Sequence, residues 1–162
     1  DKILCAKYRK GHYEGVLEIM SRFIILVKPK LIFMGEKDYQ QLIIVKDYIK
    51  DKFKSKIFPC KTIRDKNNVA LSSRNYLLSK NDLINAGLIS ITLKKTKIRI
   101  KKKRNIDRYL SDVKRDLSNK FKIKIEYLEV RNEVNLKRNY HNKKYRIFIS
   151  YYINNVRLID NF

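Results

Sequence analysis

The fold class is indicated by one stretch of the chain, Leu31-Ile32-Phe33-Met34-Gly35-Glu36-Lys37-Asp38-Tyr39-Gln40-Gln41. Its first four residues are all apolar and are closed by a glycine, which is typical of a short buried strand in a parallel sheet. Its second half is polar and leads into a segment with helical spacing. In open α/β sheets, ligands collect outside the carboxyl ends of the strands, so this junction is also a candidate binding site.

The segments on either side of this stretch support an α/β layer. Residues 14–28 have apolar side chains at helical spacing, and Pro29 ends the predicted helix because proline disfavours the helical conformation in the residue before it. Residues 37–52 are helical again, and residues 56–63 form another predicted strand. The order helix, strand, helix, strand predicts a parallel sheet.

The pattern changes after Asn75. The following elements are predicted: helices over residues 79–93 and 106–121, and strands over residues 124–130, 145–153 and 156–159. Ser79 is the expected N-cap of the first helix, and Asn154-Asn155 the expected turn between the last two strands. In the first strand, alternation places Ile125 and Tyr127 on one face. Two helices followed by three strands indicate a small α+β domain, so we expect domains at 1–75 and 76–162.

The composition limits the class of protein. The 162 residues include 44% hydrophobic residues, which is too many for a disordered chain, and their longest apolar runs are too short to span a membrane. Cys5 and Cys60 lack metal-ligand spacing and are too few for a disulfide framework. We therefore expect two free thiols, no membrane association and a cytoplasmic location.

The formal charge of +23 allows two interpretations. Lysine, isoleucine and asparagine have A/T-rich codons, so a biased genome would produce the excess without a polyanionic partner. Alternatively, the basic run Lys94–Arg104 and exposed tyrosines could bind RNA. Against RNA binding, the basic run contains no interleaved aromatic residues, and nucleic acid is not the expected partner.

Two polar segments are candidate anion sites. After the first strand, free backbone N–H groups and the helix dipole favour an anion, and Lys37 and Gln41, four residues apart, are expected on one helix face. The loop Leu71-Ser72-Ser73-Arg74 offers two hydroxyls and a guanidinium, a plausible phosphate clamp. An ordinary solvated first turn and an ordinary cluster of helix-capping residues are the alternatives.

The two histidines give weaker signals. His12 follows Gly11 and has no second histidine or carboxylate pair nearby, so a structural role is favoured over acid–base catalysis. His141 lies in a polar loop and is expected to be solvated. The sequence contains no recognisable metal cluster, P-loop or nucleophilic triad.

Together these segments resemble a known family, the pantothenate synthetases (pantoate–β-alanine ligases). The resemblance rests on four elements in the family's order: Gly11-His12-Tyr13-x-Gly15-Val16, Phe33-x-Gly35-Glu36-Lys37-Asp38-Tyr39-Gln40-Gln41-Leu42, Leu71-Ser72-Ser73-Arg74-Asn75 and Arg157-Leu158-Ile159-Asp160-Asn161. It runs from about Leu4 to Asn161 and covers only the later part of the family's sequence.

The resemblance implies a fold and a reaction. The fold would be the C-terminal part of a Rossmann-like nucleotidyltransferase domain followed by a small α+β domain. ATP, with Mg²⁺, would activate pantoate as pantoyl adenylate, and β-alanine would displace AMP to give pantothenate, a coenzyme A precursor. The enzymes of the family are cytoplasmic homodimers.

The resemblance also implies roles for residues of the matching motifs. Lys37 and Arg74 would be the catalytic residues, and Gln41 would hydrogen-bond pantoate. The implied ATP-binding residues are Gly35, Glu36, Lys37, Asp38, Ile63, Leu71, Ser72, Ser73 and Arg74. No residue is assigned to a metal.

Some family features are not found here. The HxGH element and the first pantoate-binding glutamine, both from the family's N-terminal half, do not occur, and Asn67-Asn68 replaces a typical Asp-Gly turn. The chain alone is therefore expected to be incompetent for the reaction. It would be a fragment of a longer enzyme, one piece that works with a separate N-terminal half, or an inactive remnant of the enzyme.

Overall fold

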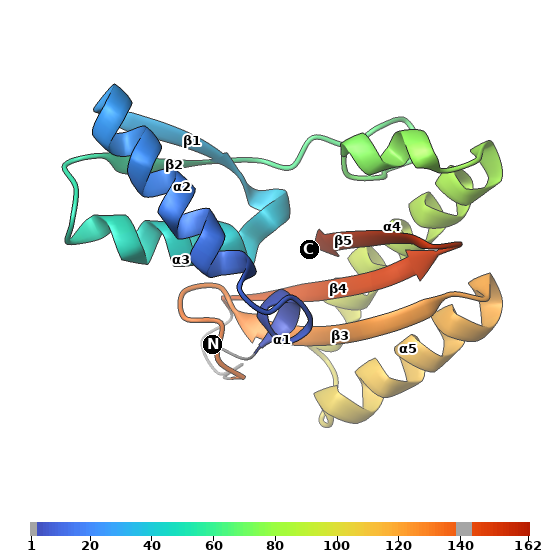
Figure 1. Cartoon of the computed structure of the whole chain (residues 1–162). Helices are drawn as coiled ribbons and strands as arrows, with labels where there is room; N and C mark the ends of the chain where they lie inside the picture. Colours follow the sequence, from blue (N-terminus) through green and yellow to red (C-terminus); the bar gives the residue numbers. More distant parts are fainter. Residues whose placement is uncertain (1–2, 139–143) are drawn as a thin grey trace. The chain divides into compact units, whose positions relative to one another are not determined.

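The computed structural model describes residues 3–138 and 144–162, and it divides into two compact units, Asp1–Thr62 and Ile63–Phe162. His141 lies outside the described residues. Figure 1 shows the helices and strands of each unit. In the part of the chain that is described, we find no helix that combines the length and apolar character needed to cross a membrane.

The first unit is an α/β unit with a two-stranded parallel sheet, in which Leu31 pairs with Lys56 and Gly35 with Cys60. Its elements are α1 (Leu4–Tyr8), α2 (His12–Val27), β1 (Leu31–Gly35), the 3₁₀ turn η1 (Glu36–Asp38), α3 (Tyr39–Lys50) and β2 (Lys56–Cys60). The predicted helices and parallel strands are confirmed, although β2 ends three residues earlier than predicted. Helix α2 is capped at its C-terminus by Lys28, whose φ of 48° is left-handed.

The core of this unit lies on one face of the sheet. Ile24, Val45 and Ile49 are buried there and pack against Ile32 and Met34 of β1. The opposite face is open: Leu31 is 50% and Phe33 66% exposed. The prediction that residues 31–34 form a buried strand is therefore wrong. The side chains of a strand point alternately to its two faces, and the described chain covers only one of them.

The second unit has the predicted α+β order. Its elements are η2 (Ser73–Leu77), α4 (Lys80–Ile100), α5 (Ile106–Phe121), β3 (Lys124–Asn132), β4 (Tyr145–Ile153) and β5 (Val156–Asn161). The antiparallel strands have the order β3-β4-β5, which leaves β5 at an edge. Apolar residues of α4 and α5, such as Leu93 and Leu110, share one core with Ile147 and Ile149 of the central strand.

The beginning of helix α4 confirms the predicted N-cap, Ser79. The Ser79 hydroxyl accepts a hydrogen bond from the Asp82 N–H, and the Asp82 carboxylate accepts one from the Ser79 N–H. This reciprocal pair satisfies backbone donors that have no partner within the helix. Helix α5 is capped at its C-terminus by Lys122, again in a left-handed conformation, with φ of 51°.

Two predictions for this unit are wrong. Helix α4 continues to Ile100 rather than ending at residue 93, so most of the basic run Lys94–Arg104 is helical, with Thr96 and Ile100 buried. In β3, a bulge between Ile125 and Tyr127 interrupts the alternation. Ile125 pairs with Tyr151 of the helix-covered core, whereas Tyr127 pairs with Ser150 on the other face.

The compact units divide thirteen residues before the predicted domain boundary at 75 and 76. The segment Ile63–Asn75 belongs to the second unit, where Arg64 and Ala70 form an isolated antiparallel bridge. The assignment of functions to the domains 1–75 and 76–162 stays a prediction.

Candidate functional site

The turn after β1 positions the first candidate residues. Gly35 ends the strand with extended backbone, and Glu36–Asp38 form a 3₁₀ turn before α3 begins at Tyr39. Lys37 and Gln41 therefore do not lie on one helix, as the four-residue spacing had predicted, because only Gln41 is in α3. The Lys37 side chain is 19% exposed, and its Nζ lies 3.9 Å from the Asp38 carboxylate.

A buried glutamine that the sequence analysis did not single out holds this turn in place. The Gln40 Oε1 accepts hydrogen bonds from the Cys5 N–H at 3.0 Å and from the Tyr13 hydroxyl at 3.1 Å. Its Nε2 donates to the Ile3 carbonyl at 2.9 Å. Gln40 thus ties α3 to the segments around α1 and α2, while Gln41, the next residue, is only half-buried. Burial, with smaller contributions from neighbouring groups, raises the pKa of Tyr13, so its hydroxyl stays a donor at neutral pH.

The glycine–histidine motif begins helix α2. Gly11 has a left-handed φ of 72°, which glycine adopts without steric cost, and it forms the N-cap. The His12 Nε2 lies 2.8 Å from the Arg9 guanidinium, so a cation is one of the neighbours of the histidine ring.

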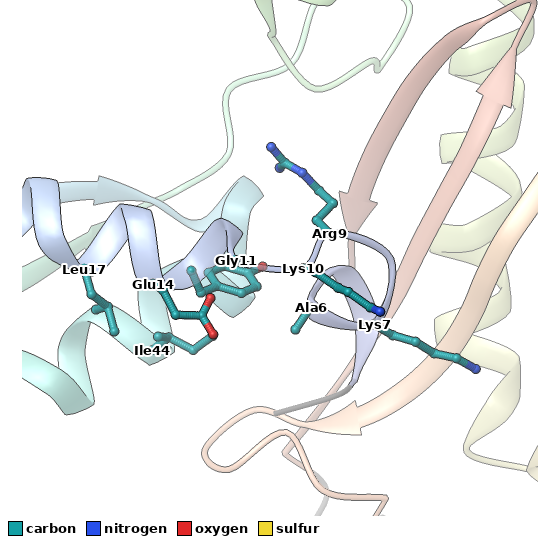
Figure 2. Close-up of a pocket in the computed structure, with 9 residues that line it drawn as sticks. Ala6, Lys7, Arg9, Lys10, Gly11, Glu14, Leu17 and Ile44 are labelled. Carbon is teal, nitrogen blue, oxygen red and sulfur yellow. The ribbon is translucent and has the colours of Figure 1, made fainter.

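The same region lines a pocket of about 680 Å³ within the first unit. Figure 2 shows Lys7, Arg9 and Lys10 extending from α1 and the turn that follows it, with Glu14 of α2 nearby. The pocket is therefore rich in cationic side chains, and the sequence analysis did not assign it a ligand.

The second candidate segment is the serine loop, Leu71–Arg74, near the start of the second unit; hydrogen bonds hold it in place. The Leu71 N–H donates to the Ile63 carbonyl at 3.0 Å, which closes the loop at its base. Ser72 caps η2 by accepting a hydrogen bond from the Arg74 N–H at 3.2 Å. Leu71 and Ser73 are exposed, whereas Ser72 and Arg74 are half-buried. The Arg74 guanidinium donates to the backbone carbonyl of Arg157 at 3.1 Å.

Arg64 fixes the beginning of this loop, and the sequence analysis missed it. Its guanidinium donates two hydrogen bonds to the carboxylate of Asp160, at 2.7 and 2.9 Å. It also donates to the Asn68 carbonyl at 3.0 Å and to the Ser90 hydroxyl at 3.1 Å, and it lies over the Phe162 ring. An isolated arginine in a sequence gives no indication of such a distant partner.

A second ion pair, which is largely buried, lies on the sheet face opposite the helices. The Glu126 carboxylate accepts hydrogen bonds from the Arg157 Nε and Nη2 at 2.9 and 2.7 Å, from the Ser150 hydroxyl at 2.8 Å and from the Tyr152 hydroxyl at 3.1 Å. Burial by itself raises the pKa of Glu126, but the hydrogen bonds and the charge of Arg157 outweigh it, so the pKa lies below its ordinary value.

The candidate residues therefore fall into two groups. Residues Gly35–Asp38 and Gln41 lie in the first unit, and Ile63 and Leu71–Arg74 lie in the second. Within residues 3–138 and 144–162, no group of three histidine, cysteine, aspartate or glutamate side chains could hold a metal ion.

The architecture defines the class: α/β proteins that carry a small helix-backed α+β domain. A sequence model of the family described as pantoate-beta-alanine ligase matches residues 1–162. The chain belongs to this family.

Relatives and solved structures agree with this assignment. The pantothenate synthetase of Flavobacterium psychrophilum is 37% identical over 159 residues, which cover 96% of this chain and 56% of that protein. The bifunctional pantoate ligase/cytidylate kinase of Prochlorococcus marinus is 42% identical over 139 residues, covering 83% of this chain and 26% of that protein.

Two crystal structures match almost the whole chain. Pantothenate synthetase from Thermus thermophilus superposes with a TM-score of 0.87 at 26% identity, over 99% of this chain and 59% of that one. The ligase from Francisella tularensis, complexed with beta-gamma ATP and beta-alanine, gives 0.76 at 32% identity, over 99% and 54%. The chain thus spans little more than half the length of these ligases and corresponds to their C-terminal part.

Proposed function

We propose that this chain contributes the ATP-phosphate and pantoate contacts of a ligase that condenses pantoate with β-alanine. The observation that carries the proposal is a pair of motifs, one in each unit of this family member. The first motif places a lysine in the turn after a strand, and the second places an arginine in the serine loop. The ATP and β-alanine complex of the Francisella relative supports these two molecules as substrates.

The reaction would proceed in two steps. The pantoate carboxylate attacks the α-phosphorus of ATP, which forms the acyl-phosphate bond of pantoyl adenylate and releases pyrophosphate. The amine of β-alanine then attacks the acyl carbon, loses a proton and displaces AMP. Both steps move negative charge among phosphate oxygens, so fixed cations accelerate them chiefly by electrostatic stabilisation and positioning.

The residues of this chain would supply these contacts. Lys37 and Arg74 would neutralise charge on the phosphates, and the amide of Gln41 would hydrogen-bond pantoate. Ile63 would meet the adenine through its backbone. The remaining contacts to ATP would come from Gly35, Glu36, Asp38, Leu71, Ser72 and Ser73.

A magnesium ion would accompany ATP. Among the described residues, no group of three histidine, cysteine, aspartate or glutamate side chains fits a protein-held ion. In the complete enzyme we expect a cytoplasmic homodimer, and a separate polypeptide could supply the portion of the family's length that this chain does not span.

The test is to express residues 1–162 joined to the complementary N-terminal portion of the Flavobacterium relative. Replacing Lys37 or Arg74 by alanine should lower the rate of pantoyl adenylate formation about 10²–10³-fold, the loss typical of one preorganised donor. The matched control replaces Lys101, Lys102 and Lys103, which are exposed beyond α4, and should leave the rate unchanged.

Two outcomes would contradict the proposal. Full adenylation by both single variants would show that Lys37 and Arg74 have no catalytic role. An inactive assembled protein that binds RNA tightly, and loses this binding only in the triple lysine variant, would instead favour the RNA-binding function.

A further inference from the structure

The guanidinium of Arg74 is held by an edge strand. Its Nη1 donates to the carbonyl of Arg157 on β5, and among the described residues β5 has a neighbouring strand on one side only. An edge strand is fixed by ladder hydrogen bonds on that one side, so side-chain contacts contribute more to its position.

The Arg157 side chain provides such a contact. Two of its nitrogens donate to the same oxygen of Glu126, and the two side chains are only 13% and 10% exposed. The hydroxyls of Ser150 and Tyr152, both on β4, donate to the same carboxylate. One carboxylate therefore links all three strands at the residue that holds Arg74.

The β-bulge explains how Glu126 reaches this position. Ile125 pairs with Tyr151 and Tyr127 with Ser150, so Glu126 has no residue opposite it. A bulge of this kind re-aims a side chain and strengthens the local twist, and bulges are frequent next to active sites. Here it allows the Glu126 carboxylate to meet Arg157, which pairs with Tyr152 on the neighbouring strand.

We propose that Glu126, through Arg157, is a positioning residue that fixes the guanidinium of Arg74 for the phosphates of ATP. This inference rests on the proposed function for its catalytic consequence, but not for its structural part. In this proposal Glu126 acts without contacting a substrate, and its effect is transmitted along Arg157 to the carbonyl that Arg74 binds.

A second ion pair on the same strand supplies the matched control. The Glu129 carboxylate accepts a hydrogen bond from the Arg131 Nε at 2.8 Å, and the two side chains are 20% and 10% exposed. Replacing Glu126 by glutamine breaks its largely buried pair with Arg157, which joins β3 to β5. Replacing Glu129 breaks its largely buried pair with Arg131 within β3 and a longer contact, 3.5 Å, with Arg138. Only the Glu126 pair includes Arg157. An effect caused by a general loss of stability would therefore appear in both variants, whereas an effect on Arg74 should appear only in Glu126→Gln.

The structural part is tested on the 162-residue chain by NMR of the arginine side chains. Restricted rotation of the Arg74 guanidinium should give separate Nη signals in the wild-type chain and in Glu129→Gln. In Glu126→Gln these signals should average together. Tyr152→Phe removes only one hydrogen bond to Glu126, so it should change the Arg74 signals in the same direction to a smaller extent. Unchanged Arg74 signals in both Glu126→Gln and Tyr152→Phe would overturn the inference.

The catalytic part is tested by a double-mutant cycle in the assembled enzyme. Glu126→Gln should lower kcat for adenylate formation by up to about 10²-fold, the scale of a misplaced catalytic group. Because the effect runs through Arg74, Glu126→Gln should add nothing in an Arg74→Ala background. Full additivity would overturn the positioning role. If Arg74→Ala alone leaves the rate unchanged, the proposed function of Arg74 fails, while the NMR result still decides the structural part.

Discussion

Arg64 and Asp160 form a two-point ion pair between residues 96 positions apart, with both guanidinium Nη atoms bonded to the two carboxylate oxygens. Arg74 reaches the same strand ten residues further along, at the Arg157 carbonyl. The segment that carries the candidate serine loop is therefore fastened to β5 at both of its ends. The loop between these two points has little freedom to move away from the strand.

Replacing Asp160 by asparagine should destabilise the second unit strongly. Arg64 would keep its charge in a site where it is only 16% exposed, and breaking a buried pair by removing one partner costs about 3–5 kcal/mol. Hydrogen exchange of β4 and β5 amides under native conditions measures this loss. The exposed pair of Asp112 and Arg115 is the control, because Asp112→Asn should cost less than about 1 kcal/mol. Equal effects of the two substitutions would contradict the prediction.

The stability that Glu126 contributes should depend on pH. Its pKa is lower in the folded chain than in the unfolded chain, so the contribution is fully present above the unfolded value of about 4.3. The contribution is lost as the pH falls through the lower folded value. The stability difference between the wild type and Glu126→Gln should therefore be constant from pH 7 to about pH 5 and shrink below about pH 4. Urea unfolding across this range, followed by circular dichroism, tests it, and a difference that grows on acidification would refute it.

Two helical glycines should respond in opposite ways to alanine. A Cβ on Gly87 of α4 would lie 2.1 Å from the Asn67 carbonyl oxygen, which is backbone, whereas a Cβ on Gly15 of α2 would meet nothing within 4 Å. Gly87→Ala should destabilise the chain by about 1–3 kcal/mol through overpacking. Gly15→Ala should stabilise it by about 0.5–1 kcal/mol through helix propensity. Thermal unfolding of both variants measures the sign of each stability change. A stabilising Gly87→Ala would show that the backbone at Asn67 can move away at little energetic cost.

Backbone amides of β1 should exchange faster than those of β4. The described residues of the first unit form a sheet of two strands, with one face open at Leu31 and Phe33. The central strand β4 instead has hydrogen-bonded neighbours on both sides and a helix-covered face. Hydrogen exchange by mass spectrometry compares residues 31–34 with 145–153 directly. Slower exchange in residues 31–34 would be incompatible with this prediction.

Purified residues 1–162 should show no ligase activity by themselves. The chain spans little more than half the length of the related ligases, and the HxGH element expected from the family does not occur in it. The assay measures AMP release that depends on both pantoate and β-alanine. Activity should appear when the complementary portion of a relative is added, and measurable turnover without that addition would disprove the prediction.

Periodicity in the sequence was sufficient for most of the fold. Helix α5 and strand β4 have the bounds that the spacing predicts, 106–121 and 145–153, because each has one apolar face in a shared core. The end of α4 was harder to predict, because the basic run contains many charged residues. Thr96 and Ile100 lie within this run and continue the buried face of α4. The bulge at Glu126 was not predictable from alternation, since an inserted residue leaves no signal in the composition.

The sequence motifs predicted where the candidate site lies, but not which side chains contact one another there. The motifs identified the turn after β1 and the serine loop, and both segments contain 3₁₀ turns. Gln40, Arg64 and Glu126 were missed because their importance depends on partners between 24 and 97 residues away. Patterns in a single sequence show only the spacing of nearby residues. Because these three side chains act through tertiary hydrogen bonds, such patterns could not identify them.

The helix ends at Lys28 and Lys122 have a consequence for how this chain could be strengthened. Helices commonly close with a glycine in the left-handed conformation, but the chain has only four glycines. Among the described residues with positive φ, only Gly11 is a glycine. A side chain at such a position costs about 1–2 kcal/mol, so two lysines impose a recurring conformational penalty on the folded state. Because glycine is scarce in this chain, two single substitutions to glycine, at Lys28 and at Lys122, should each increase the stability of the folded state.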